Sequence, residues 1–162
     1  MKKVIVTGGS GFIGSNLVKY LLKKKYYVIN IDKLSYSANP YNIKDLKKNK
    51  NYFFFKVDLN NRKKIIRILN KYKPEGIFNL AAESHVDRSI DKPENFVKNN
   101  ILGTYNLLES ILLYRKKNKK KIRLVHVSTD EVYGDITNEK SSTERHPYKP
   151  SSPYAASKAS AD

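Results

Sequence analysis

The residues Thr7-Gly8-Gly9-Ser10-Gly11-Phe12-Ile13-Gly14 form a glycine-rich turn directly after the apolar, β-branched segment Lys3–Thr7. That segment predicts a short strand, and the residues from Phe12 to about Lys24 predict a helix with one apolar side. Glycines at such a junction permit a tight turn and let the backbone approach a pyrophosphate, while the helix N-terminus offers free N–H groups. The strand, turn and helix together are the context that a dinucleotide-binding turn requires.

The rest of the chain repeats the order strand, helix, strand. Strands are predicted at residues 27–32, 52–57, 76–80 and 122–128, and helices at 41–48, 61–72, 93–114 and from 153 through 162, with a polar loop over 135–152. Strands that alternate with helices imply parallel βαβ units with right-handed crossovers. The predicted fold class is therefore α/β, with a Rossmann-type doubly wound parallel sheet in a single domain over residues 1–162.

Composition narrows the possible classes of protein. The chain has no cysteine, so it has neither a disulfide framework nor a thiolate metal site. No His, Asp and Glu spacing suggests another metal site, and no stretch approaches the roughly 18 apolar residues of a membrane span. We expect a cytoplasmic protein with no metal and no membrane partner.

The formal net charge of +17 comes mostly from lysine and is scattered along the sequence. The densest run, Arg115-Lys116-Lys117-Asn118-Lys119-Lys120-Lys121, lies between a predicted helix and a predicted strand and contains no aromatic residue. Such runs are usually solvated helix ends or loops, so no nucleic-acid partner is expected. A basic nucleic-acid binder nevertheless stays open as an alternative.

Polar residues follow the predicted strands at their carboxyl ends, where ligands bind in open parallel sheets. Asp32 ends the second strand, where its carboxylate can accept a hydrogen bond from a ribose 2′-hydroxyl and would repel a 2′-phosphate. The expected cofactor is therefore NAD and not NADP. Asp58, after the third strand, could meet the adenine amino group or could cap the following helix. Leu80-Ala81-Ala82-Glu83-Ser84 ends the fourth strand with small residues.

Tyr154 and Lys158 are one helical turn apart and face the same way. A nearby ammonium and a positive nicotinamide ring would lower the pKa of the phenol from its usual value of about 10, so that Tyr154 could accept a proton from an alcohol. Thr129 could share a hydrogen bond with the same hydroxyl. The adjacent Asp130 and Glu131 suggest that a step besides hydride transfer takes place.

These motifs resemble the extended short-chain dehydrogenase/reductase family, and within it the dTDP-glucose 4,6-dehydratase branch. The resembling residues are Thr7–Asn16, Asp32–Tyr36, Leu80–Ile90, Asn100–Thr104, Ser128–Asp135 and Pro150–Lys158. The string Ala82-Glu83-Ser84-His85-Val86-Asp87-Arg88-Ser89 and the Asp130–Glu131 pair are specific to this branch, since related epimerases usually lack the acid pair.

The resemblance implies an NAD-dependent lyase of dTDP-rhamnose biosynthesis that acts on a dTDP-sugar and recycles its cofactor. Its implied catalytic residues are Thr129, Asp130, Glu131, Tyr154 and Lys158, and its implied substrate contacts are Ser84 and Thr129. The implied cofactor contacts are Gly8, Gly11, Phe12, Ile13, Gly14, Asp32, Lys33, Leu34, Ser35, Asp58, Leu59, Leu80, Ala81, Ala82, Ser84, Asn99, Tyr154 and Lys158.

Members of this branch are much longer than the present chain and form homodimers. The chain is therefore expected to be the N-terminal portion of such an enzyme, with the substrate-binding domain absent. We expect an exposed sheet edge, an uncovered apolar face, and little or no turnover by residues 1–162 alone. Another nucleotide-sugar dehydratase or epimerase, such as a UDP-glucose 4,6-dehydratase, and an inactive NAD-binding module remain open.

Overall fold

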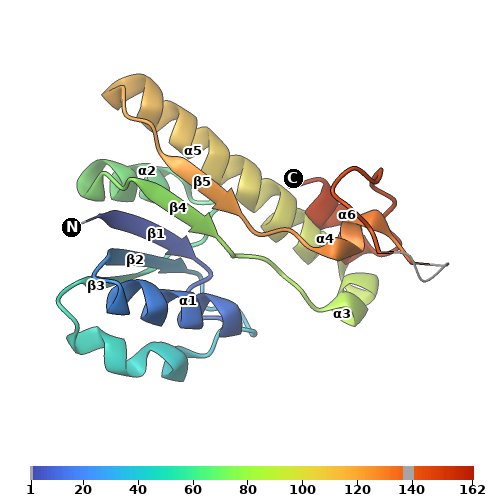
Figure 1. Cartoon of the computed structure of the whole chain (residues 1–162), viewed down its shortest axis with the longest axis horizontal. Helices are drawn as coiled ribbons and strands as arrows, with labels where there is room; N and C mark the ends of the chain where they lie inside the picture. Colours follow the sequence, from blue (N-terminus) through green and yellow to red (C-terminus); the bar gives the residue numbers. More distant parts are fainter. Residues whose placement is uncertain (1, 137–140) are drawn as a thin grey trace. The chain divides into compact units, whose positions relative to one another are not determined.

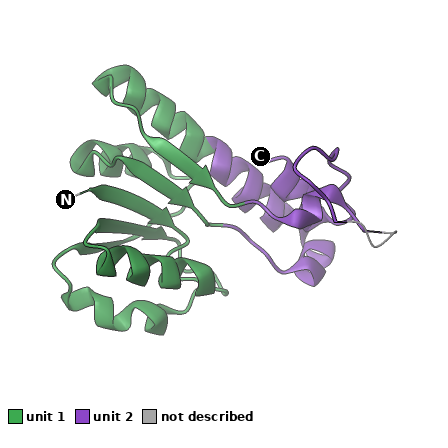
Figure 2. Ribbon diagram, viewed as in Figure 1, with its two compact units in different colours: residues 1–81, 106–127 green, residues 82–105, 128–162 purple. Residues whose placement is uncertain are grey.

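The computed structural model describes residues 2–136 and 141–162 and divides the chain into two compact units (Figure 2). Unit 1 comprises residues 1–81 and 106–127, and unit 2 comprises residues 82–105 and 128–162. Part of the predicted loop over 135–152, residues 137–140, lies outside the described residues.

Unit 1 contains a five-stranded parallel sheet in the order β3-β2-β1-β4-β5 (Figure 1). The strands are β1 (Lys3–Thr7), β2 (Tyr27–Asp32), β3 (Tyr52–Lys56), β4 (Gly76–Asn79) and β5 (Arg123–His126). Thr7 at the end of β1 pairs with Ile31 on one side and with Asn79 on the other, so these strands end at a common edge. The strand order reverses at β1, which makes the end of β1 the switch point where ligands bind in such sheets. The predicted α/β fold class is confirmed.

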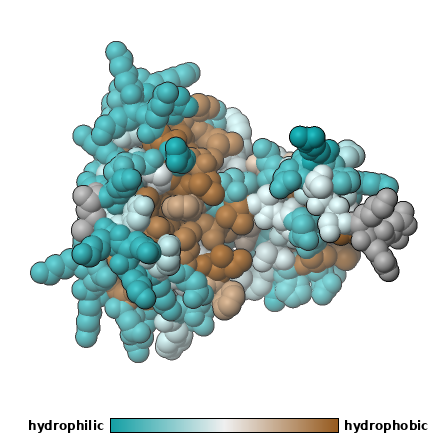
Figure 3. Space-filling model, viewed as in Figure 1, coloured by the Kyte–Doolittle hydropathy of each residue, from teal (hydrophilic) through white to brown (hydrophobic). Residues whose placement is uncertain are grey.

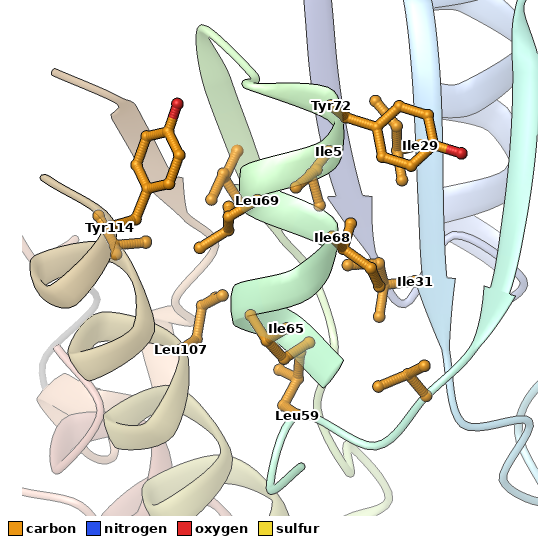
Figure 4. Close-up of a cluster of buried hydrophobic side chains, with 13 residues drawn as sticks. Ile5, Ile29, Ile31, Leu59, Ile65, Ile68, Leu69, Tyr72, Leu107 and Tyr114 are labelled. Carbon is orange, nitrogen blue, oxygen red and sulfur yellow. The ribbon is translucent and has the colours of Figure 1, made fainter. Parts of the chain in front are cut away.

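Helices cover both faces of this sheet because alternate strand residues point to opposite sides. Helix α1 (Phe12–Lys23) and the 3-10 helix η1 (Pro40–Lys48) pack on one face, around Val6 and Val18. Helix α2 (Arg62–Tyr72) and the unit 1 part of α5 (Gly103–Asn118) cover the other face (Figure 4).

The larger core lies on the α2 and α5 side. Helix α2 directs Ile65, Ile68, Leu69 and Tyr72 inward at helical spacing, toward Ile5 of β1. Leu69 is fully buried, and burying a side chain of this size contributes about 1.5–3 kcal/mol. The sheet edge that carries the glycine turn is thus fixed by packing from both faces.

Strand β5 forms one edge of the sheet and pairs with β4. Its residue Val125 is 42% exposed, and Val127 just beyond the strand is 40% exposed. Figure 3 shows hydrophobic side chains gathered over β4 and β5. The exposed edge and the incompletely covered apolar face that the sequence predicts are both present.

Unit 2 differs from the sequence prediction in its helices. The predicted helix 93–114 is three segments, α4 (Pro93–Phe96), a π-helical segment η2 (Val97–Leu102) and then α5. Two short helices, α3 (Val86–Asp91) and the 3-10 helix η3 (Asp130–Tyr133), are not predicted because they are too short for a periodic pattern.

Helix α6 (Pro153–Ala159) ends three residues before the last residue, whereas the sequence predicts a helix through Asp162. The backbone N–H groups of Ala161 and Asp162 both donate to the Lys158 carbonyl, so the final turn tightens after Ala159. Within the part of the chain that the structure describes, no helix is long and apolar enough to cross a membrane.

Candidate active site

The glycine turn of unit 1 tolerates no side chain at two of its positions. Gly8 has φ +68°, and a Cβ there would lie 2.8 Å from the Ala81 Cα. A Cβ on Gly14 would lie 2.1 Å from the Gly8 carbonyl oxygen. Gly11 donates its N–H to the same carbonyl at 3.1 Å and precedes the first turn of α1. The turn therefore brings bare backbone to the N-terminus of a helix, which favours a phosphate group there.

Asp32 lies at the end of β2 and is 8% exposed. Its Oδ2 accepts a hydrogen bond from the Ser10 N–H at 2.9 Å, and its Oδ1 accepts from the Leu34 N–H at 2.8 Å. A carboxylate offers about four lone pairs, so both oxygens retain capacity for a further donor. The carboxylate thus ties the glycine turn to the segment containing Lys33, Leu34 and Ser35 while remaining able to accept from a ribose.

The remaining cofactor candidates of unit 1 follow β1, β3 and β4. Phe12 and Ile13, at the start of α1, are 81% and 64% exposed, which is unusual for apolar residues and suits contact with a ligand. Asp58 accepts from the N–H of Asn60 at 2.8 Å, next to the buried Leu59. Because Asn61 caps α2 by accepting from the Lys64 N–H, the alternative of Asp58 as the helix cap is wrong.

A polar network that sequence reasoning missed joins the ends of β1, β4 and β5. The Thr7 hydroxyl donates to Asn79 Oδ1 at 2.6 Å, and Asn79 Nδ2 lies 2.9 Å from His126 Nδ1. The Ala81 N–H donates to the Thr7 Oγ1 at 3.2 Å. This network fixes the path of Leu80 and Ala81 beside Gly8, and strand register was needed to find it.

In unit 2, Tyr154 stands on α6, whose start is well defined. The Ser152 Oγ accepts from the Ala155 N–H at 3.0 Å, and Pro153 occupies the first turn. Helix α6 packs against η3, and η3 carries Asp130 and Glu131. The structure therefore brings Thr129, Asp130 and Glu131 into the electrostatic field of the Tyr154 phenol.

The pKa of Tyr154 is raised above its ordinary value of 10.0, chiefly by burial. A hydrogen bond with Thr129 lowers it in part, and the carboxylates of Glu131 and Asp130 raise it further. The expected lowering of this pKa requires the nicotinamide ring as well as Lys158, and it stays a prediction. Burial also lowers the pKa of Lys158 from 10.5, while the charge of Asp162 opposes that change.

Asp162 is a residue beside the catalytic candidates that sequence reasoning did not identify. Its Oδ2 accepts from the Ser128 hydroxyl at 2.5 Å and from the Tyr148 hydroxyl at 3.2 Å. It therefore fixes the residue directly before Thr129 and acts electrostatically on Lys158.

Asn100 is another residue that sequence reasoning did not identify as functional, and it lies buried in the π-helical segment η2. Its Oδ1 accepts from the Glu83 N–H at 2.8 Å, and its Nδ2 donates to the Glu83 carbonyl and to the Ser157 Oγ at 2.9 and 2.8 Å. Ser157 in turn donates to the Tyr154 carbonyl at 2.7 Å. Asn100 thus connects the segment that carries Ser84 to the helix that carries Tyr154. A signal existed in the sequence, since Asn99-Asn100 is a poor pair for a helix interior.

The other predicted residues of unit 2 have simpler settings. Ser84 is exposed and precedes His85, the N-cap residue of α3, and Ala82 is half-buried. Asn99, expected at the cofactor, donates to Glu83 Oε1 at 3.2 Å. Across residues 2–136 and 141–162, no three His, Cys, Asp or Glu side chains are grouped so that they could hold a metal ion.

Unit 1 therefore carries the glycine turn, Asp32 and the other cofactor candidates up to Ala81, and unit 2 carries every catalytic candidate. Each set is assembled within its own unit by the contacts described above. Such a division suits an enzyme that binds a dinucleotide with one part of the chain and performs acid–base chemistry with another.

Known proteins are similar to this chain over nearly its whole length. A dTDP-glucose 4,6-dehydratase of Haemophilus influenzae is 48% identical over 168 residues, which cover 100% of this chain and 50% of that protein. The crystal structure of a dTDP-glucose 4,6-dehydratase from Streptomyces venezuelae, with NAD and TYD bound, superposes with a TM-score of 0.89 at 40% identity and covers 98% of this chain and 49% of its own. A UDP-glucose 4-epimerase from Thermus thermophilus in complex with NAD gives a TM-score of 0.85 at 35% identity, over 98% of this chain and 48% of its own.

The chain thus spans about half the length of the curated relatives it matches. The model of the GDP-mannose 4,6 dehydratase family matches residues 5–162, from the first strand through Asp162. That match includes the glycine turn, the Thr129–Glu131 segment and the Tyr154–Lys158 pair. The chain belongs to the GDP-mannose 4,6 dehydratase family.

Proposed function

We propose that this chain is the N-terminal portion of an NAD-dependent dTDP-glucose 4,6-dehydratase, a lyase that converts dTDP-glucose to dTDP-4-keto-6-deoxyglucose. The observation that carries the proposal is the coupling of Tyr154 to Thr129, Asp130 and Glu131 within one unit. The relatives at 40–48% identity that are named for this activity support it.

The residues of unit 1 fit NAD. Glycine at positions 8 and 14, where a Cβ would clash with backbone, lets the turn pack tightly at the start of α1, where a pyrophosphate would bind. Asp32 would accept from a ribose hydroxyl with its remaining lone pairs. NAD, when bound, would accept the hydride from C4 and return it to C6 after the loss of water, so that it is not consumed, and its positive ring would also stabilise a neighbouring phenolate.

Tyr154 acts as the base toward the 4-hydroxyl of the hexose. Burial and two carboxylates keep the phenol protonated in the protein by itself, so Tyr154 becomes a base only when positive charge is added near it. Lys158, on the next turn of α6, places an ammonium on the same face. Thr129 holds the phenol by a hydrogen bond and can share the substrate hydroxyl.

Asp130 and Glu131 perform the elimination. A ketone at C4 makes the proton at C5 acidic, and Glu131 removes that proton as a general base. Asp130 in its protonated form donates a proton to the departing 6-hydroxyl, which leaves as water. The two acids must hold opposite protonation states, which neighbouring carboxyl groups achieve when their surroundings differ.

A second candidate is an epimerase or a dehydratase acting on another nucleotide sugar. The similarity to a UDP-glucose 4-epimerase favours it, because that protein shares the fold at 35% identity. An epimerase needs a Tyr and a Lys but no elimination, so a paired Asp130 and Glu131 would have no role in it. The acid pair therefore favours the dehydratase.

The function is tested with a chimera in which residues 1–162 are joined to the half of the Haemophilus influenzae relative that this chain does not match. The chimera is supplied with dTDP-glucose and catalytic NAD. A 4-keto-6-deoxy product, which absorbs in alkali, is the expected result. An epimerised sugar without that absorbance would overturn the proposal in favour of the second candidate. Thermal melting and NAD titration of the same chimera show whether it is folded. Residues 1–162 alone are expected to bind NAD but to turn over little substrate.

The complete form is proposed to be a cytoplasmic homodimer that takes a dTDP-sugar as substrate.

A further inference from the structure

The net charge is divided unequally between the two units. Unit 1 contains 25 Lys and Arg against 5 Asp and Glu, a net +20, whereas unit 2 contains 7 against 10, a net −3. The excess that looks scattered in the sequence is therefore carried by the unit with the glycine turn.

Within unit 1 the fold gathers this charge on one edge of the sheet. The segments that precede the five strands, residues 2–3, 23–25, 47–50, 71–75 and 115–123, contain seventeen Lys and Arg and a single acid, Glu75. All seventeen cations are exposed. In a parallel sheet these segments lie at the amino ends of the strands, and Figure 3 shows hydrophilic side chains on the side from which the strands of Figure 1 start.

The opposite edge, which carries the glycine turn, is much less basic. Its segments 8–11, 32–39, 56–64 and 80–81 contain five Lys and Arg against two acids, Asp32 and Asp58. The basic edge is therefore separate from the proposed cofactor site, and the binding of NAD does not account for it.

A hollow of about 390 Å³ lies at the densest part of the basic edge, at the end of α5. Its lining residues are Leu112, Arg115, Lys116, Lys119, Lys120 and Lys121. Lys119 has φ +52° and donates its N–H to the Arg115 carbonyl at 2.8 Å, so the chain turns back after the helix. Residues 119–121 after this turn and Arg115 and Lys116 before it all line the hollow.

The cations exceed what the helix itself requires. A helix C-terminus carries roughly half a negative charge, which one or two cations neutralise. The hollow is lined by five cations and no acid. Five like charges around one space repel one another, and an anion with several charges relieves that repulsion.

We propose that this hollow binds a linear oligophosphate, either inorganic or the phosphate tail of a nucleotide. Four of the five cations are lysines, which bind phosphates as point charges. The lining contains no aromatic side chain on which a base could stack, so recognition is directed at the phosphate chain. The other cations of the edge raise the local concentration of such an anion.

The test is calorimetric titration of the chain, with NAD saturating so that the cofactor site is filled, using sodium tripolyphosphate, ATP and orthophosphate. Tripolyphosphate and ATP are expected to bind with similar affinity, orthophosphate much more weakly, and all less tightly as salt rises from about 50 to about 200 mM. Absence of tripolyphosphate binding would overturn the proposal. So would much tighter binding of ATP, since that would show recognition of the base.

Two variants of equal net charge separate the hollow from general basicity. The triple variant Lys119→Gln, Lys120→Gln, Lys121→Gln is expected to weaken tripolyphosphate binding by about tenfold, from three lost charge pairs. The matched triple Lys19→Gln, Lys63→Gln, Lys64→Gln removes three exposed lysines from the helices of the same unit and is expected to change it less than about twofold. Equal losses in the two variants would refute a site in the hollow. NAD affinity, measured in parallel, reports whether each variant is folded.

Discussion

Replacing Asn100 by alanine should loosen unit 2 and leave unit 1 intact. The Asn100 amide makes three hydrogen bonds, two with the backbone of Glu83 and one with Ser157. Alanine makes none of them, and it leaves the Glu83 N–H and carbonyl buried without these partners, because Glu83 is 6% exposed.

The size of the effect follows from these contacts. Three hydrogen bonds at a net value of about 1 kcal/mol each give about 3 kcal/mol, and the stranded backbone groups of Glu83 bring the total to about 3–5 kcal/mol. The better helix propensity of alanine returns about 0.5 kcal/mol. Asn99→Ala is the matched control, because Asn99 is half-buried and its hydrogen bond to Glu83 Oε1 is worth about 1 kcal/mol.

Hydrogen exchange followed by mass spectrometry resolves the two units in one experiment. Peptides from residues 82–105 and 128–162 should lose protection in Asn100→Ala, and peptides from residues 1–81 should keep it. The reasoning is refuted if Asn100→Ala loses no more protection than Asn99→Ala, or if both units lose protection equally.

Three further predictions concern single residues. Gly8→Ala should weaken NAD binding in a titration by at least about tenfold, because Gly8 has φ +68° and its Cβ would lie 2.8 Å from Ala81. The control Gly76→Ala should leave NAD binding unchanged, because its Cβ would meet no atom nearer than 3.5 Å. Similar losses in the two variants would argue against a pyrophosphate at the turn. Lys158→Met should raise the melting temperature at pH 7, because the pKa of the buried ammonium is lowered and its charge therefore costs stability below that pKa. The gain should vanish as the pH rises toward 10.5, and an equal gain at both pH values would contradict this reasoning. Asp162→Asn should lower the pKa of Lys158 further in an NMR titration, and an unchanged or higher pKa would exclude the proposed influence of Asp162.

The sequence predicted the parts of the molecule that depend on local pattern. Short apolar segments predict the five strands and the spacing of glycines predicts the turn, because both patterns lie in consecutive residues. Asp32 follows from its position at a strand end, and the structure places its carboxylate beside the turn as that position implies. The side-by-side placement of η3 and α6 also agrees with the interpretation of Thr129–Glu131 and Tyr154 as one site.

What the sequence could not supply depends on tertiary contacts. Asn100 and Asp162 are functional candidates only because of partners 17 to 57 and 14 to 34 residues away in the sequence. Burial raises the pKa of Tyr154 in the protein by itself, and residue spacing does not reveal burial. The gathering of cations on one edge required the strand order and direction.

Tyr154 and Glu131 are proposed to act in sequence on one hexose, and a borohydride quench of the chimera with dTDP-glucose and NAD separates the two steps. Glu131→Gln should stop after oxidation at C4, so that the quench yields a mixture of gluco and galacto sugars and no 6-deoxy sugar. Tyr154→Phe should yield neither galacto nor 6-deoxy sugar. Unimpaired formation of the 6-deoxy sugar by Glu131→Gln would contradict the assignment of Glu131 as the base at C5.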